Sequence, residues 1–381
     1  MNVILIVSDG YPKHFSANNA KGEFIAKGLQ SCGCKVAMVD GVLGHNGTQV
    51  MEHGVSSTGI EYYILPRKGG AIQAVVSNQK VINRILREHY VEGDINYVIL
   101  GIDLLPFFGG LVLSAKRFGY KTTALYHEWH YGMSHKNKLF KMEAYFRDQT
   151  FGYFLDSILP IGHFLQDKSK PFKKPMMLLP VLGNFERERV GYSGAMQFTY
   201  CGHIAYVLRN QMLLNAFIRL KKDITQAKLV LVVLGNKQHF ARLHDLLQEK
   251  SLLDNVEVKT QLSQEKLYAL YDTSLALLLP LDPSNLQDKA RFSQKTAEYA
   301  ASRRPIITSS VGEMPYYFKD KKSAMLAEYS ADGYYKAMLY LATHLDDANK
   351  IGQAGYEVGK EYFDYLSAGR KLMEFFRATN K

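Results

Sequence analysis

Short apolar runs alternate with longer amphipathic stretches along most of this chain. Apolar runs of about four to eight residues, separated by helical patterns of about ten or more, are typical of parallel strands joined by crossover helices. The pattern therefore predicts an α/β fold. In the first half we expect helices over 21–33 and 72–90, and strands over 3–9, 35–41, 61–66, 97–102, 121–127 and 157–162.

The alternation lapses over 184–197, where charged and small residues replace the apolar runs. It then resumes, and it predicts strands over 198–204, 228–235, 256–261, 275–281, 305–310 and 323–328. A chain of 381 residues exceeds the size at which single cores usually stop growing. We therefore predict two doubly wound, Rossmann-like domains, 1–187 and 188–360, and a helical tail from Ala331. The aromatic-rich end of that tail, 361–381, is expected to cross back to the first domain to cover its apolar face.

The most apolar stretch, 97–115, approaches the length of roughly 20 residues that spans a bilayer. Asp103, Pro106 and the Gly109–Gly110 pair interrupt it, so a buried strand followed by a core-facing helix explains it better. The N-terminus has no charged leader before its apolar run and soon reaches Asp9, so we expect neither a signal peptide nor an anchor there.

The formal charge of +11 and the pI near 9.2 call for an anionic partner. Nucleic acid, an anionic membrane and phosphorylated small molecules all qualify, but no recognised nucleic-acid-binding module occurs, which disfavours the first. The spacing of Cys32 and Cys34 matches neither a zinc knuckle nor a thioredoxin-type motif, and Cys201 stands apart. We therefore expect a cytoplasmic protein.

Candidate chemistry begins where a polar loop leads into a helix near Ser293. Ser293 can cap that helix, whose open amides and positive end attract an anion. Lys295 adds a cation, and Glu298 lies three residues further on the same face. Such a carboxylate can accept hydrogen bonds from two ribose hydroxyls while the cation and amides hold a diphosphate. A plain ion pair on a solvated helix face explains the same two residues.

The segment 292–315, FSQKTAEYAASRRPIITSSVGEMP, resembles glycosyltransferase family 4, a large group of retaining enzymes with the GT-B fold. The resemblance covers the second half of the chain and, more loosely, the first. It implies two Rossmann-like domains that face a central cleft, with the acceptor on the first and a nucleotide-sugar donor on the second. The positions in register with the Lys-x-x-Glu-Tyr form of the family's motif are Phe292, Lys295, Glu298, Tyr299, Pro305 and Gly312.

The resemblance also implies particular site residues. His203 and Arg209 correspond to the family's two diphosphate-flanking cations, although His203 is also explained as an ordinary strand-end histidine. His127 corresponds to a histidine that contacts the sugar, and Gly10, with Lys21 and Gly22, to the first loop. The first glutamate of the family's motif would fall at Ala290, which leaves the donor sugar open. The implied catalytic residues are His127 and Glu298, and the implied substrate-binding residues are Gly10, Gly202, His203, Arg209, Gly235, Leu262, Ser293, Lys295 and Tyr299.

The function implied is transfer of a sugar, with retention, to a glycan or a lipid-linked acceptor in cell-surface polysaccharide or glycolipid synthesis. The chain has no D-x-D triplet, so we expect no metal, and His127 with His130 has no obvious third ligand. We expect no cofactor beyond the donor. Lysines interleaved with aromatics over 134–147 and 166–175 suit either the inner face of an anionic membrane or a solvated surface. A sugar-nucleotide 2-epimerase and a catalytically inactive scaffold of the same fold remain the alternatives.

Overall fold

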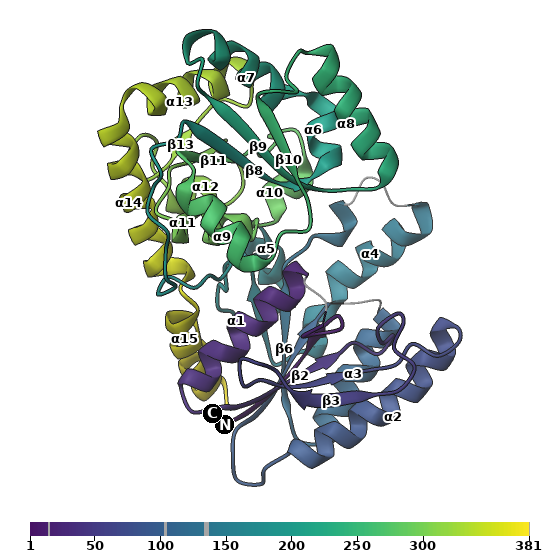
Figure 1. Cartoon of the computed structure of the whole chain (residues 1–381). Helices are drawn as coiled ribbons and strands as arrows, with labels where there is room; N and C mark the ends of the chain where they lie inside the picture. The colour runs from purple at the N-terminus through teal and green to yellow at the C-terminus, as the bar shows by residue number, and fades with distance from the viewer. Residues whose placement is uncertain (14–15, 103–104, 133–136, 381) are drawn as a thin grey trace. The chain divides into compact units, whose positions relative to one another are not determined.

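The computed structural model describes residues 1–13, 16–102, 105–132 and 137–380. The chain forms two compact units (Figure 1). The N-terminal unit comprises Met1–Leu182 together with Ala290–Gln294 and Tyr362–Lys381, and the C-terminal unit comprises Gly183–Lys289 and Lys295–Glu361. Each unit has its own parallel sheet with helices packed against it, which confirms the predicted α/β class.

A seven-stranded sheet forms the centre of the N-terminal unit. All neighbouring strands pair in parallel except β3 and β4, which are antiparallel. The six strands predicted from apolar runs are present. The sequence pattern missed β3, because this half-exposed edge strand reads Glu-His-Gly-Val. In spatial order the strands are β3 (Glu52–Val55), β4 (Glu61–Ile64), β2 (Lys35–Asp40), β1 (Asn2–Ser8), β5 (Asn96–Gly101), β6 (Lys121–Tyr126) and β7 (Ser157–Pro160).

One face of this sheet shares a core with the first and last helices of the chain. The ring of Tyr97 on β5 stacks on Phe376 of α15 at 4.1 Å between centroids. Helices α1 and α15 cross so closely at Gly28 that a Cβ on this residue would lie 2.3 Å from the carbonyl oxygen of Tyr365. The helices of the unit are α1 (Ala17–Ser31), α2 (Ala71–His89), α3 (Leu105–Arg117), α4 (Lys138–Thr150), α5 (His163–Ser169) and α15 (Tyr365–Thr379).

The described residues of the apolar stretch 97–115, which are 97–102 and 105–115, contain most of β5 and most of α3, as expected for a buried strand and a core-facing helix. Among the helices that the structure describes, none combines the length and the apolar character needed to cross a membrane.

A six-stranded, all-parallel sheet forms the centre of the C-terminal unit. All six predicted strands are present. In spatial order they are β10 (Val256–Lys259), β9 (Lys228–Leu234), β8 (Gln197–His203), β11 (Ala276–Leu279), β12 (Ile306–Thr308) and β13 (Met325–Leu326).

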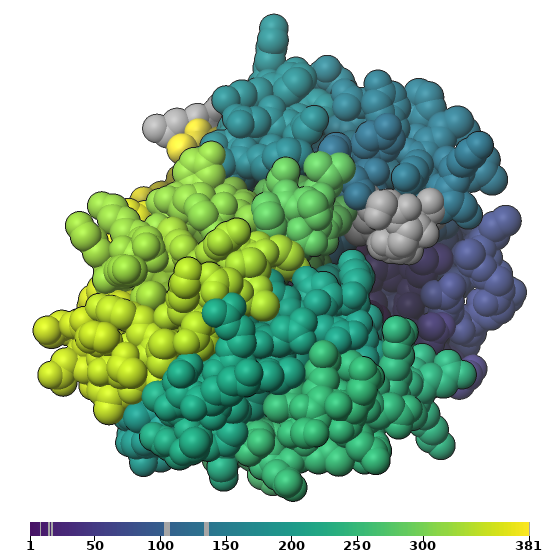
Figure 2. Space-filling model, turned by 90° about the horizontal axis from the view of Figure 1, so that it is seen from above, coloured from purple at the N-terminus to yellow at the C-terminus, as the bar shows by residue number. Residues whose placement is uncertain are grey.

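The helical tail predicted from Ala331 is also confirmed, and its first helix, α13, packs beside α7, as the space-filling view shows (Figure 2). The remaining helices are α6 (Ile204–Asn210), α7 (Met212–Asp223), α8 (Lys237–Glu249), α9 (Gln264–Thr273), α10 (Leu286–Ala290), α11 (Lys295–Ala301), α12 (Met314–Tyr317), α13 (Ala331–Thr343) and α14 (Leu345–Phe363).

Candidate functional site

The predicted pair Lys295 and Glu298 lies on helix α11 of the C-terminal unit. Lys295 Nζ donates a hydrogen bond to Glu298 Oε2 at 2.8 Å. Their side chains are 23% and 6% exposed, so this is not a pair on a solvated helix face. Burial alone would lower the pKa of Lys295, but the attraction of Glu298 outweighs it and the pKa is raised. Removal of either partner would leave an uncompensated charge in the interior.

A buried tyrosine and the strand and ring it contacts hold α11 in place. The Tyr299 side chain is fully buried, and its hydroxyl accepts a hydrogen bond from the amide of Cys201 at 3.1 Å. This bond ties α11 to strand β8. The ring of Tyr271 packs edge-on against Tyr299 at 5.0 Å between centroids. Burial raises the pKa of the Cys201 thiol, although Lys295 opposes the rise, so Cys201 is a neutral thiol at neutral pH. The structure therefore gives Tyr299 a positioning role, and the sequence did not reveal Cys201 or Tyr271 as its partners.

His203 ends strand β8 and caps helix α6. Its Nδ1 accepts a hydrogen bond from the amide of Ala205 at 3.2 Å. An acceptor at Nδ1 selects the neutral tautomer that carries its hydrogen on Nε2. Because the side chain is exposed, that N–H is open to a ligand. His203 thus offers one neutral donor, where an arginine would offer a charged fork.

Two predicted glycines lie where neighbouring side chains leave no room for a Cβ. Gly235 follows β9, and a Cβ there would lie 2.3 Å from Ile204 Cγ2 at the start of α6. A Cβ on Gly202 would likewise lie 2.3 Å from the hydroxyl oxygen of Tyr200 on the same strand, β8. Gly235 therefore lets the loop after β9 approach the start of α6, and Gly202 leaves space for the side chain of Tyr200. Leu262 lies partly buried in the loop before α9.

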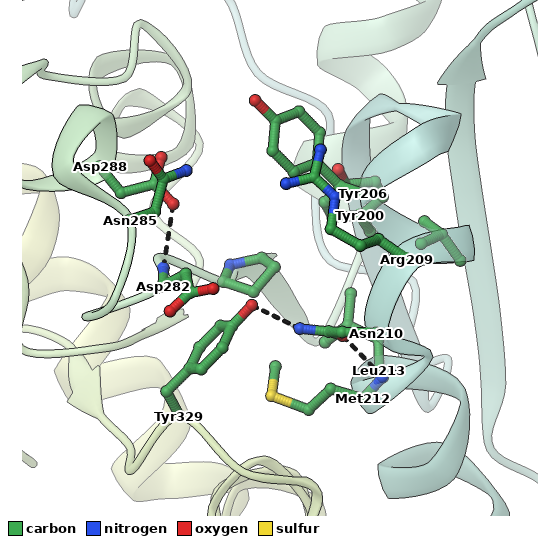
Figure 3. A pocket seen from close by; sticks show the side chains of 12 residues that line it. Tyr200, Tyr206, Arg209, Asn210, Met212, Leu213, Asp282, Asn285, Asp288 and Tyr329 are labelled. Atoms are coloured by element: carbon green, nitrogen blue, oxygen red, sulfur yellow. Dashed lines mark hydrogen bonds between the residues drawn. The ribbon is translucent and has the colours of Figure 1, made fainter. Parts of the chain in front are cut away.

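Arg209 lines a pocket beside α6 (Figure 3). Its guanidinium lies 5.3 Å from the ring centroid of Tyr206. The facing wall includes Asp282, from the loop after β11, and its amide donates to Asp288 Oδ2 at 3.0 Å. Tyr329, which follows β13, accepts a hydrogen bond from Asn210. Asp282 and Tyr329 thus belong to segments that follow strand ends, where ligands bind in open parallel sheets. The sequence predicted Arg209 here but missed Asn210 and Tyr329.

The other predicted residues lie in the N-terminal unit. His127 directly follows β6 and lines a cavity that it shares with Lys21. Burial and then the charge of Lys21 lower the pKa of His127 to about 3, so its imidazole is neutral. Gly10 has a left-handed φ of 68°, and its amide already donates to Asp40 Oδ1 at 3.0 Å. Ser293 is partly buried within Ala290–Gln294. The structure therefore groups Lys295, Glu298, Tyr299, Gly202, His203, Arg209, Gly235 and Leu262 in one unit and His127, Gly10 and Ser293 in the other.

Comparison with known proteins adds a family-model match for part of the chain and a fold for the whole. Residues 186–358 match the family model described as glycosyl transferases group 1. No protein of curated function matches the chain by sequence. Solved structures match it over almost its whole length. Sucrose-phosphate synthase from Thermosynechococcus elongatus is 14% identical at a TM-score of 0.74, with 99% of this chain and 98% of that chain covered. The Anabaena protein HepE in complex with UDP is 9% identical at a TM-score of 0.74, with 99% and 100% covered.

The chain has the GT-B fold. A glycosyltransferase from Rickettsia africae agrees, at 14% identity and a TM-score of 0.72, with 100% of this chain and 98% of that chain covered. Within the GT-B fold, the family match falls on the C-terminal unit, which carries the Lys295–Glu298 pair. Among the residues that the structure describes, no three His, Cys, Asp or Glu side chains lie together as metal ligands would.

Proposed function

We propose that this chain is a glycosyltransferase that moves a sugar from a nucleoside-diphosphate donor to a glycan or lipid-linked acceptor, with retention. The observation that carries the proposal is the buried Lys295–Glu298 pair inside the segment that matches glycosyl transferases group 1. The HepE structures contain UDP in one case and UDP-glucose in another, which supports a UDP-sugar as the donor here. The reaction would serve the synthesis of cell-surface polysaccharide or glycolipid at the cytoplasmic face of a membrane.

Lys295 and Glu298 can bind the nucleoside diphosphate while the hydrogen bond between them stays intact. An ammonium group has three donors, and the bond to Glu298 Oε2 uses one of them. Another can donate to a phosphate oxygen, while the second oxygen of Glu298 accepts from the ribose hydroxyls. Arg209 and the Nε2–H of His203 would add donors to the diphosphate. Charge then develops on the leaving diphosphate where cations are already in place, which is how preorganised sites lower a barrier.

In the proposed reaction the bond between the anomeric carbon and the diphosphate oxygen breaks, and the acceptor hydroxyl attacks from the same face. The proton of that hydroxyl leaves with the diphosphate. His127 is neutral and would hydrogen-bond a hydroxyl of the donor or the acceptor sugar. Gly10 and Ser293 remain proposed contacts of the substrates.

The proposal is tested by UDP release from a panel of UDP-sugars, with and without sugar acceptors. Glu298→Gln should lose roughly 10- to 100-fold in kcat/KM, because a charged hydrogen bond to the ribose contributes about 1.5–3 kcal/mol. Lys360→Met is the matched control, since Lys360 forms an exposed pair with Glu186 at 2.9 Å in the same unit. Turnover of no donor in the panel, or equal losses in both variants, would refute the proposal. Free epimerised nucleotide sugar would point to the epimerase instead.

We also propose that helix α4 docks on an anionic membrane. Leu139, Met142 and Phe146 on this helix are 73%, 56% and 54% exposed, and their spacing puts them on one face. Tyr153 and Phe154 add exposed aromatic surface immediately after the helix. Lys138 lies beside Leu139 and is exposed. An exposed apolar face with adjacent lysines fits an interfacial helix on anionic lipid.

Co-sedimentation with vesicles tests this surface. The wild-type protein should bind vesicles of phosphatidylcholine with phosphatidylglycerol more strongly than phosphatidylcholine alone, and salt should weaken the binding. The double variant Leu139→Glu/Phe146→Glu should lose it. Ile72→Glu is the control, because Ile72 is 82% exposed on another helix, α2. Equal binding by both variants would show that α4 is not the docking surface.

A further inference from the structure

A cavity of about 240 Å³ lies at the carboxyl ends of the central strands of the N-terminal sheet. Its walls come from the ends of β1, β5 and β6, from Gly41 after β2, and from helices α1 and α3. Much of the lining is apolar, but a few polar groups converge on it. Such a cavity is large enough for one sugar ring and much smaller than a whole nucleoside-diphosphate sugar would need. Its lining includes Ile6, Leu125, Asn18, Lys21 and His127.

Lys21 is the cation of this cavity. It lies on α1 and is only 7% exposed. Its Nζ donates one hydrogen bond, to the carbonyl oxygen of Leu179 at 3.3 Å. Within the described part of the chain, no carboxylate pairs with it. A buried ammonium normally has a partner of opposite charge, because burial of an unpaired charge is costly.

His127 offers a second polar atom at the same cavity. Its Nδ1 is buried and has no hydrogen-bond partner among the described residues. The ring hydrogen-bonds to the backbone of Leu125, and a neutral imidazole has one N–H, so the unpartnered Nδ1 is an acceptor that suits a sugar hydroxyl. Asn18, one turn before Lys21 on α1, adds an amide group to the lining. Among the described residues, the cavity thus combines a cation that no carboxylate pairs with and an imidazole acceptor with apolar walls such as Ile6 and Leu125.

We propose that this cavity is a subsite for an acidic group, a carboxylate or a phosphate, carried by the acceptor sugar. The inference rests on the proposed glycosyltransferase function and specifies its acceptor as anionic. Lys21 supplies the charge, and His127 supplies an acceptor for a neighbouring hydroxyl of the sugar. The diphosphate of the donor is a different anion, and Lys295 and Arg209 of the C-terminal unit are already assigned to it.

Burial lowers the pKa of Lys21 to about 7, which adds a second readout. A carboxylate ligand keeps its charge above pH 5, and His127 stays neutral over the same range because its pKa is lowered to about 3. His130 also acts on His127 through its charge when protonated. The affinity of the wild-type protein for glucuronate should therefore fall as the pH rises from 6 to 8.5, through loss of the Lys21 proton.

Isothermal titration of the whole 381-residue chain tests the proposal, with glucose, glucuronate, glucose 6-phosphate, inorganic phosphate and UDP as probes. At pH 6 the wild type should bind glucuronate or glucose 6-phosphate at least tenfold more tightly than glucose. Lys21→Met should abolish that preference and leave UDP affinity unchanged. Lys27→Met, on the same helix in a partly exposed pair with Glu23, should keep the preference. The pH dependence of the wild type provides a test that needs no variant.

Three outcomes would overturn the inference. The first is equal affinity of the wild type for glucose and both acidic sugars. The second is inorganic phosphate binding as tightly as glucose 6-phosphate, which would indicate a site for free anions. The third is loss of UDP affinity in Lys21→Met, which would indicate that Lys21 binds the diphosphate of the donor substrate and not the acceptor. Failure of UDP to bind any sample would instead refute the proposed function, independently of the acidic-sugar preference.

Discussion

Replacement of Lys21 by methionine should stabilise the folded protein while it removes the acceptor preference. Methionine keeps most of the side-chain volume and removes a buried charge. The pKa of Lys21 is about 7 instead of 10.5, and each tenfold change in acidity corresponds to about 1.4 kcal/mol, so the charge costs the folded state roughly 4 to 5 kcal/mol. The carbonyl of Leu179 loses its donor, at a cost of about 1–3 kcal/mol. We therefore expect a net stabilisation of about 2 kcal/mol.

The pH dependence follows from the direction of the pKa shift. The unfolded chain keeps the Lys21 proton up to about pH 10, whereas the folded chain releases it near pH 7. Between these values the unfolded state binds more protons, so wild-type stability rises with pH. The advantage of Lys21→Met is therefore complete below pH 7 and disappears near pH 10.

Thermal unfolding of the wild type, Lys21→Met and Lys27→Met at pH 6.5 and pH 9.5 measures this effect. At pH 6.5 we expect Lys21→Met to raise Tm by roughly 5 °C, since about 1 kcal/mol corresponds to 2–4 °C in units of this size. The partly exposed control Lys27→Met should change stability by less than about 0.5 kcal/mol. A loss of stability in Lys21→Met at pH 6.5, or a gain that persists at pH 9.5, would refute the reasoning.

Further substitutions at Lys295, His203 and Gly235 test the C-terminal unit. Lys295→Met should destabilise by about 3–5 kcal/mol in urea unfolding, because it leaves Glu298 buried and unpaired, and Lys295→Met/Glu298→Gln should recover most of that loss. A double variant no more stable than the single one would argue against a buried ion pair. His203→Ala should lose about 1 kcal/mol with its cap, whereas His203→Asn should keep the cap, and both should bind UDP more weakly. Equal stability of the two would contradict the capping role. Gly235→Ala should cost about 1–3 kcal/mol in thermal unfolding, because its Cβ would lie 2.3 Å from Ile204 Cγ2. Gly191→Ala in the same unit meets open space and is the control, so equal losses in the two would show that crowding is not the cause.

Most of the fold could be predicted from the sequence, because buried parallel strands need continuous apolar runs. Strand β2, for example, is buried from Val36 to Asp40. Its short run of apolar residues is what a strand buried on both faces requires. Strand β3 could not be predicted in this way, because it lies at the edge of the sheet and is only partly buried, so it has no continuous apolar run. It is a strand because its backbone pairs with β4, and the local sequence does not reveal that pairing.

The candidate site was predictable only in part. The three-residue spacing placed Lys295 and Glu298 on one face of a helix, and the structure pairs them. The burial of the pair depends on β8 and α9, which are distant in sequence, so the local pattern looked equally like a surface ion pair. The burial of Lys21 could not be predicted from the sequence either, because nothing in the local pattern distinguishes a lysine that faces a cavity from one that faces solvent. Its burial follows from the packing of α1 beside the segment that carries Leu179.

UDP binding tests the central claim most directly, and isothermal titration can measure it on the wild type and the Lys295→Met/Glu298→Gln variant. The double variant is expected to keep its fold, so a change in affinity reports on the site. We predict that the wild type binds UDP and that the variant binds it at least tenfold more weakly. Absence of UDP binding by the wild type, or equal affinity of the two proteins, would contradict the assignment of this pair to a nucleotide-sugar site.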